Sequence, residues 1–226
     1  MSIAREHRIE VVRSARYFTL GPEDASAKEL WFVLHGYGQL AAQFIRVFDA
    51  LDDGTRFIVA PEALNRFYLA NVDTTPAAER PVGATWMTRE DREREIVDYL
   101  GYLDRVADSV RARVPHARVT VLGFSQGTAT AARWVARGDI RPMHTILWGG
   151  FLPPELDLGE QHPLRRSQLF IVSGEHDRFV TTERVVEEEH RLQTAGLSYE
   201  LIRYPGGHGI ARDRLKELSR RLSPHA

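Results

Sequence analysis

The sequence predicts an α/β fold, in which a mostly parallel central sheet carries helices on both faces. Two observations lead to this prediction. Short apolar runs rich in β-branched residues alternate along the chain with amphipathic segments of helical period, a pattern typical of parallel strands joined by crossover helices. One such run, residues 119–122, leads directly into Gly123-Phe124-Ser125-Gln126-Gly127 and then into a helix of small residues. A strand, a G-x-S-x-G turn and a helix in this order are typical of an exposed nucleophilic serine.

The first part of the chain predicts strands around one helix. In order, we expect one or two edge strands within residues 8–20, a buried strand over 29–34, a helix from about 39 to 51 and a strand over 56–60. Residues 61–88 break this rhythm because they carry three prolines and no clear period. We expect there a long irregular loop whose large aromatics, including Phe67 and Trp86, either wall a pocket or pack against one another on the surface.

The second part of the chain alternates more regularly. We expect a long amphipathic helix over 89–114, the strand 119–122 with its helix 128–136, strands over 144–148, 168–173 and 198–204, and helices over 181–195 and 210–222. No repeat or linker interrupts this order, so residues 1–226 are expected to form a single domain.

The composition of the chain argues against several classes of function. Hydrophobic residues make up 43% of the 226 positions, and 30 basic against 31 acidic residues give a formal net charge of -1, so a nucleic-acid partner has no electrostatic support. No apolar run approaches the roughly 20 residues of a membrane helix, and the charged start has no apolar signal segment. We therefore expect no membrane span and a cytoplasmic protein. The chain has no cysteine, no paired metal-ligand spacing and no nucleotide-binding fingerprint, so no cofactor or metal is expected.

Three residues that follow strand ends have the types that acyl transfer requires. Ser125 is the candidate nucleophile, and His208, in a glycine-rich loop after the last strand, is the candidate base. Asp177 follows the preceding strand and can accept the imidazole Nδ1 proton. Because active sites of open α/β sheets form at the carboxyl ends of strands, we expect the three side chains to meet there. Their order along the chain is that of a serine–aspartate–histidine triad on this type of sheet.

Stabilising an oxyanion requires two preorganised N–H donors. We expect one from the backbone of Gln126, next to the nucleophile, and the other from the loop after the second buried strand, at the backbone of Tyr37. His35 in that loop is interpreted as structural, and His176 as a mere neighbour of Asp177.

The motifs L-H-G-Y-G, G-F-S-Q-G, S-G-E-H-D-x-x-V and G-G-H-G together resemble the phospholipase/carboxylesterase family of α/β-hydrolases, which includes the acyl-protein thioesterases and small bacterial esterases. The resemblance spans about residues 30–220. It implies a compact α/β-hydrolase fold without a large cap, a triad of Ser125, Asp177 and His208, and oxyanion amides at Tyr37 and Gln126. This chain has Thr128 where members usually have a second glycine after the elbow.

These observations predict a serine hydrolase that cleaves small-molecule carboxylic esters with short to medium acyl groups through an acyl-serine. An acyl-thioesterase or lysophospholipase on the same machinery remains an alternative, as does a non-catalytic scaffold that binds a small molecule. The acyl pocket is expected to be walled by large apolar side chains near Ser125. The candidates are Tyr37, Phe67, Trp86 and Phe151, with Val180 from the D-x-x-V motif. The sequence leaves the oligomeric state open.

Overall fold

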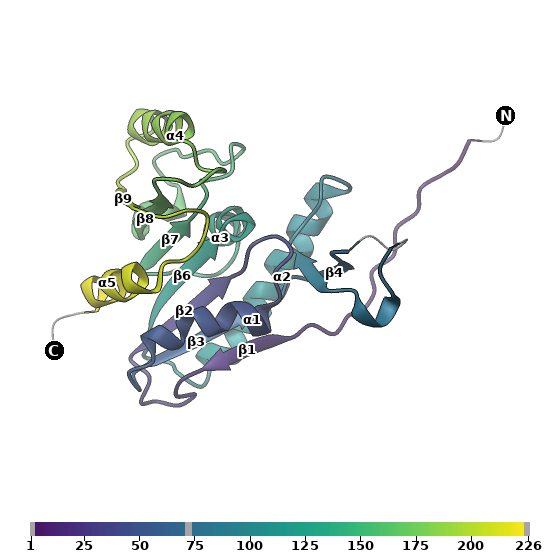
Figure 1. Cartoon of the computed structure of the whole chain (residues 1–226), viewed down its shortest axis with the longest axis horizontal. Coiled ribbons are helices and arrows are strands. Elements are labelled where there is room, and N and C mark those ends of the chain that lie inside the picture. Colours follow the sequence, from purple (N-terminus) through teal and green to yellow (C-terminus); the bar gives the residue numbers. More distant parts are fainter. Residues whose placement is uncertain (1–2, 71–73, 224–226) are drawn as a thin grey trace.

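The computed structural model describes residues 3–70 and 74–223, and its centre is one seven-stranded sheet (Figure 1). The strands lie in the order β1-β3-β2-β6-β7-β8-β9. Their bounds are β1 Tyr17–Leu20, β2 Glu29–Leu34, β3 Arg56–Pro61, β6 Arg118–Phe124, β7 His144–Trp148, β8 Gln168–Gly174 and β9 Glu200–Tyr204. Only β1 pairs antiparallel to its neighbour in this sheet, and the other pairs are parallel. The expected mostly parallel sheet is confirmed.

Helices cover both faces of the sheet, as the alternating pattern predicts. Their bounds are α1 Ala41–Phe44, α2 Arg92–Arg111, α3 Gln126–Arg137, α4 Thr182–Thr194 and α5 Arg212–Leu222, with 3-10 turns η1 Ile45–Leu51, η2 Ala77–Glu79 and η3 Pro163–Arg166. Side chains of α2, α3 and α4 share one buried cluster, and those of α1, η1 and α5 share the other. No large cap covers the sheet in the described part of the chain (Figure 1).

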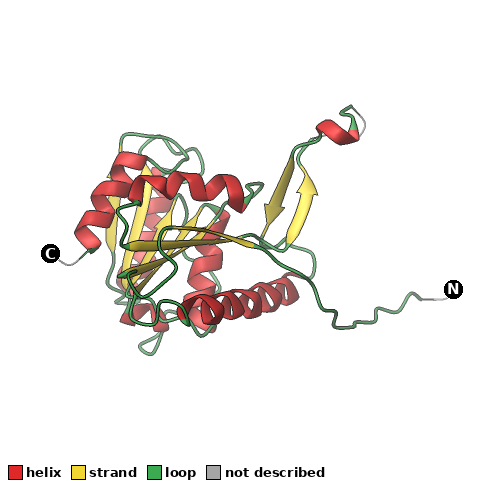
Figure 2. Cartoon of the chain, turned by 90° about the horizontal axis from the view of Figure 1, so that it is seen from below, coloured by secondary structure: helices red, strands yellow, loops and turns green. Residues whose placement is uncertain are grey.

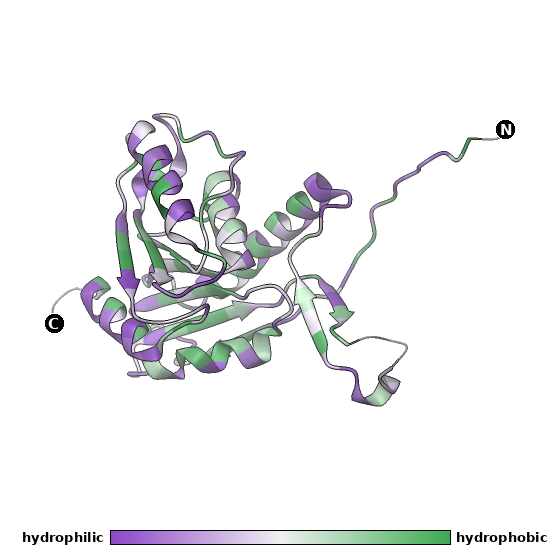
Figure 3. Cartoon of the chain, turned by 45° about the horizontal axis from the view of Figure 1, so that its top comes forward, coloured by the Kyte–Doolittle hydropathy of each residue, from purple (hydrophilic) through white to green (hydrophobic). Residues whose placement is uncertain are grey.

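Strand β2 shows how the sequence specifies two cores. Leu30, Phe32 and Leu34 pack in the cluster beneath α2 and α3, while Trp31 and Val33 pack in the cluster beneath α1 and α5. Successive side chains of a strand point to opposite faces, so a strand buried on both sides is an unbroken apolar run. Figure 3 shows the hydrophobic colours along the strands and polar colours on α4 and α5.

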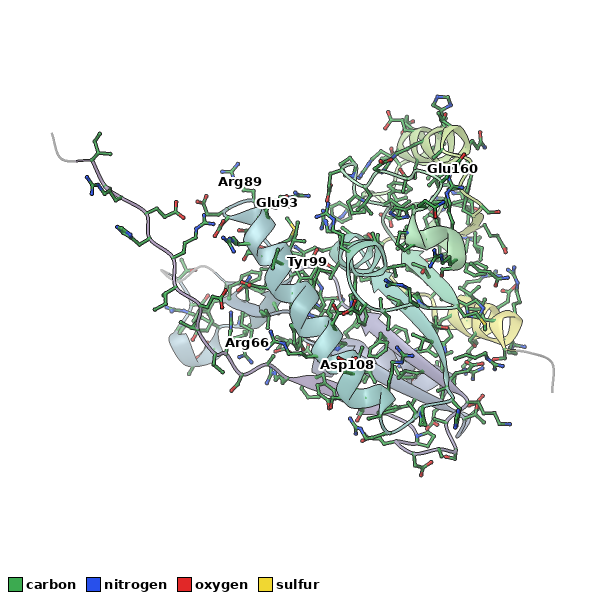
Figure 4. All side chains as sticks on the ribbon, turned by 180° about the vertical axis from the view of Figure 1, so that it is seen from behind. Arg66, Arg89, Glu93, Tyr99, Asp108 and Glu160 are labelled. Atoms are coloured by element: carbon green, nitrogen blue, oxygen red, sulfur yellow. The ribbon has the colours of Figure 1, made fainter. Side chains whose placement is uncertain are left out.

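The helix α2 obeys the expected helical period but is shorter than residues 89–114. It begins at Arg92, after Asp91 in the left-handed region with φ 46°. Figure 4 follows it from Glu93 near its start, past Tyr99, to Asp108 near its end. Tyr99 is fully buried, so the apolar stripe of α2 lies against the sheet and its charged residues face solvent. None of the helices in the described ranges is long and apolar enough to cross a membrane.

The prediction of an irregular segment over residues 61–88 is wrong for its described part, and its residues 71–73 lie outside the described residues. Strand β4 (Asn65–Tyr68) pairs antiparallel with β5 (Val82–Thr85) in a two-stranded hairpin, which extends away from the main sheet in Figure 2. The strands are only four residues long and are separated by a proline-containing segment, so their period could not be read from the sequence. The hairpin joins the body where the Gly38 amide donates to Ala84 O at 2.9 Å.

In the first part of the chain, one further prediction is confirmed and one is corrected. Of the one or two edge strands expected within residues 8–20, one forms, β1, at the edge of the sheet. The helix expected over 39–51 is one turn of α-helix, α1, continued by the 3-10 turn η1.

Candidate active site

Ser125 lies in the sharp turn between β6 and α3, with φ 53° and ψ -115°. Positive φ is strained for a residue with a side chain and persists only where the surroundings impose it. They do so here because strand and helix backbones almost touch. A Cβ on Gly123 would lie 2.1 Å from Gly127 O, and a Cβ on Gly127 would lie 2.2 Å from Leu34 O. Both glycines of the motif are therefore required by the crossing itself.

The structure brings the three candidate catalytic side chains into one hydrogen-bonded chain. Ser125 Oγ lies 2.9 Å from His208 Nε2, and His208 Nδ1 lies 2.8 Å from Asp177 Oδ2. The other carboxylate oxygen, Oδ1, accepts the amides of Phe179 at 2.8 Å and Val180 at 3.2 Å. An ionised carboxylate only accepts hydrogen bonds, so the imidazole proton is assigned to Nδ1 and Nε2 presents its lone pair to Ser125.

Two aromatic rings, and hydrogen bonds to the backbone of its loop, hold His208 in position. Its ring centroid lies 5.0 Å from that of Phe124 and 4.7 Å from that of Phe179, which packs edge-on. The neighbouring Gly209 carbonyl accepts from Tyr204 Oη at 2.5 Å and from Trp148 Nε1 at 3.0 Å. The imidazole therefore does not depend on its glycine-rich loop alone for its orientation.

The loop after β2 presents a free amide beside Ser125. The Gly36 amide donates to Gln39 Oε1 at 2.8 Å, the Gly38 amide to Ala84 O at 2.9 Å and the Gln39 amide to Gly36 O at 3.3 Å. Within residues 3–70 and 74–223, the amides of Tyr37 and Gln126 have no protein acceptor. These are the two amides that the sequence predicts for an oxyanion.

His35 holds the loop after β2 in place through buried hydrogen bonds. It is fully buried, and burial lowers the pKa of its imidazole, so the ring is neutral at pH 7. Its Nε2 accepts the Ala63 amide at 3.0 Å, and its carbonyl accepts Trp86 Nε1 at 2.8 Å. Its contacts are those of a structural residue.

The side chain of Gln126 has a function that sequence reasoning missed. Its Nε2 donates to Thr85 Oγ1 at 2.8 Å and to Met87 O at 3.0 Å, while its Oε1 accepts the Trp86 amide at 3.2 Å. The residue after the nucleophile therefore ties the start of α3 to the end of the hairpin. The G-F-S-Q-G motif contains this glutamine, but its hydrogen-bond partners lie about 40 positions earlier in the sequence. No sequence pattern links the two segments.

A cavity of about 760 Å³ opens at Ser125 and contains some of the predicted pocket residues. Tyr37, Phe151 and Val180 line it. Phe67 does not, although its ring lies 5.2 Å from that of Tyr37.

The structure places Trp86 in the core rather than at this cavity, which corrects the expectation of a wall there. It is 1% exposed, and its ring packs 5.1 Å from His35 and 6.2 Å from Tyr99. The position follows from the hairpin, because β5 leads Trp86 inward beneath the loop after β2. An irregular segment would not have fixed the direction in which the Trp86 side chain points.

Arginines also line the cavity, at positions the sequence did not single out: Arg133, Arg178 and Arg184. Arg133 is buried and its Nε donates to Glu155 Oε1 at 2.7 Å. Burial opposes ionisation of Glu155, but hydrogen bonds from Arg133 and its charge outweigh this and hold the pKa of the carboxyl at about 2. In the ranges that the structure describes, no group of three or more His, Asp and Glu side chains is arranged to hold a metal ion.

The fold and this site define an α/β-hydrolase of the serine hydrolase class. The family model described as "Serine hydrolase (FSH1)" matches residues 25–217. The chain therefore belongs to the FSH1 serine hydrolase family, and the expectation of a serine hydrolase is confirmed. A comparison with curated proteins finds no match.

Solved structures show the same fold. Acyl-protein thioesterase 2 from Zea mays aligns with TM-score 0.67 and 17% identity, over 92% of this chain and 98% of that one. A carboxylesterase from Bacillus cereus aligns with TM-score 0.67 and 16% identity, over 92% and 95%. A phospholipase/carboxylesterase from Dyadobacter fermentans aligns with TM-score 0.66 and 22% identity, over 94% and 98%. The resemblance drawn from the motifs is confirmed by the family model and by this shared fold.

The close crossing at the elbow generates a stability prediction. Gly127→Ala places a Cβ against the Leu34 carbonyl, and we expect it to lower the free energy of unfolding by about 2–3 kcal/mol, as overpacking of a rigid site does. Urea unfolding at pH 7 measures this. Gly101→Ala is the matched control, because its new methyl has only Arg105 Nη2 nearby, at 3.8 Å, and alanine favours the α2 helix. Equal stability of the two variants would contradict the account of the elbow.

Proposed function

We propose that the protein hydrolyses carboxylic esters of short to medium acyl chain length through a covalent acyl-Ser125 intermediate. The observation that carries the proposal is the alignment of Ser125 Oγ, His208 and Asp177 through hydrogen bonds of 2.9 and 2.8 Å. The two free amides beside the serine and the adjoining cavity support it.

In the proposed reaction, His208 Nε2 takes the Ser125 hydroxyl proton as the oxygen attacks the ester carbonyl. The carbonyl oxygen becomes an oxyanion, which the amides of Tyr37 and Gln126 stabilise. The same imidazole then gives the proton to the departing alcohol. His208 then takes a proton from water, which attacks the acyl carbonyl, and returns that proton to Ser125 Oγ as the bond to the acyl group breaks and the acid is released.

Asp177 acts through His208. Its Oδ2 holds the Nδ1 proton, and the amides of Phe179 and Val180 hold its Oδ1. The carboxylate is only 1% exposed, so it stabilises the imidazolium that forms during the reaction in a site of low dielectric.

Loss of any triad residue should remove most of the esterase activity. Ser125→Ala and His208→Ala should each lower kcat on 4-nitrophenyl acetate by about 10⁴- to 10⁶-fold, and the double variant should be hardly slower than either, since the residues act as a unit. Asp177→Asn should also lower kcat strongly, because the amide disfavours the reactive tautomer. Ser173→Ala, on a buried serine of β8, is the control for loss of a buried hydroxyl. A Ser125→Ala variant that folds and retains more than a tenth of wild-type turnover would refute the proposal.

The wall of the cavity should limit the length of the acyl chain. Burial of each methylene contributes about 0.8 kcal/mol, so kcat/KM on neutral 4-nitrophenyl esters should rise several-fold per carbon until the cavity wall is met. Phe151 lines the cavity, so Phe151→Ala should move the optimum to longer chains. Phe67→Ala, which removes an aromatic ring outside the lining, should leave the optimum in place. A wild-type optimum at palmitoyl length, or the same profile in Phe151→Ala, would contradict the proposed acyl site.

A further inference from the structure

The charged side chains that line the cavity are all basic. Apart from the His208 imidazole and the Tyr37 phenol, the lining residues with ionisable groups are Arg133, Arg178 and Arg184, and none of the described lining residues is Asp or Glu. The cavity also contains Ser125. A substrate that reaches the nucleophile therefore meets guanidinium groups without competing carboxylates, which favours a substrate that carries negative charge.

Arg133 is not available for such a charge. Its guanidinium is buried and engages Glu155, with Tyr99 Oη at 3.4 Å from Nη1. Glu155 also pairs with Arg92 at 2.8 Å. Arg133, Glu155 and Arg92 therefore pair with one another beside the cavity, and the charge of Arg133 is already compensated.

Arg178 and Arg184, in contrast, are exposed and form no ion pair with a carboxylate in the described part of the chain. The Arg178 guanidinium carbon lies 4.7 Å from the ring centroid of Phe179. That of Arg184 lies 5.4 Å from the ring of Phe151, and its Nη1 donates to Phe179 O at 2.7 Å. Stacking on aromatic rings restrains both groups while leaving guanidinium N–H donors available.

The acid one turn after Arg184 on α4 forms no ion pair with it. Glu188 is buried, and its Oε1 accepts the Leu152 amide at 3.1 Å while Oε2 lies 3.4 Å from Arg191 Nη1. Its carboxylate is thus directed at the loop after β7 and at Arg191. Glu188 interacts electrostatically with Arg184 as well as with Arg191, but no carboxylate of the described residues forms an ion pair with Arg178 or Arg184.

The position of Phe179 decides which part of a substrate these arginines would meet. Its ring packs edge-on to His208, with centroids 4.7 Å apart and an interplanar angle of 66°. In the proposed reaction His208 delivers its proton to the departing alcohol. Arg178 stacks on this ring and Arg184 Nη1 donates to the Phe179 carbonyl at 2.7 Å, so both arginines contact the residue that packs on the proton-donating imidazole.

We propose that Arg178 and Arg184 form a subsite for a carboxylate or phosphate group on the alcohol part of the ester. The inference rests on the proposed ester hydrolysis and names the substrate class: an ester whose leaving group is an anion-bearing alcohol. The planar guanidinium fork matches both carboxylate and phosphate oxygens.

The test compares charged and neutral esters of equal shape. In the leaving-group pair, 4-(acetoxymethyl)benzoate is compared with 4-(acetoxymethyl)benzamide. In the acyl pair, the 4-nitrophenyl monoester of adipic acid is compared with its terminal amide. Each ratio of kcat/KM, charged over neutral, is measured for the wild type, for the double variant Arg178→Gln/Arg184→Gln and for Arg220→Gln. Arg220 is an exposed arginine on α5 outside the cavity lining, so its variant is the matched control for loss of positive charge.

We expect a wild-type ratio of about tenfold or more for the leaving-group pair, the size that hydrogen bonds to charged groups produce. The ratio should fall towards one in the double variant, persist in Arg220→Gln, and shrink in the wild type when salt is raised from about 0.05 to 0.5 M, because salt screens exposed charges.

A wild-type ratio near one, a preference that survives in the double variant, or a preference confined to the acyl pair would overturn the subsite. In each of those cases the neutral esters are still hydrolysed, so the proposed ester hydrolysis stands. Failure of the wild type to cleave any of the four esters would instead overturn the proposed function, and the subsite with it.

Discussion

The site depends on one steric constraint, the near-contact of β6 and α3 around Ser125. The backbone of Gly127 lies so close to Gly123 and to the Leu34 carbonyl that no side chain fits at either glycine. This crossing forces Ser125 into positive φ, which lifts its side chain out of the strand direction. It leaves the Gln126 amide at the start of α3 without an acceptor among the described residues. The strain is balanced by the parallel strands on both sides of β6, which hold its end in place.

Hydrogen bonds connect the rigid turn at Ser125 to the neighbouring loops. The Gln126 side chain binds the end of the hairpin, Trp86 binds the His35 carbonyl, and the hairpin residue Ala84 binds the Gly38 amide. The elbow, the hairpin and the loop after β2 therefore form one connected unit. Because the amides of Gly36, Gly38 and Gln39 are satisfied within that unit, the free amide of Tyr37 is held in position before any substrate arrives, as electrostatic preorganisation requires.

The sequence predicted the elements whose signals are local. Apolar runs marked the strands, and glycine-flanked Ser125, Asp177 and His208 each followed a strand end, where the topology of a parallel sheet brings side chains together. Contacts between distant segments gave no such signal. Trp86 reads as an aromatic in an irregular loop, yet the hairpin turns it into the core. Arg178 and Arg184 read as ordinary surface charges, and only the stacking of each on a ring at the cavity sets them apart.

The central claim is that Ser125, activated by His208, becomes acylated. Treating the protein with a fluorophosphonate and digesting it for mass spectrometry tests this directly, since such reagents form a stable phosphonyl ester with an activated serine and with little else. We expect one adduct, on the peptide that contains Ser125, formed at least about 10³-fold more slowly in His208→Ala. An unlabelled Ser125 in protein that still hydrolyses esters, or an adduct on another residue that abolishes activity, would contradict it.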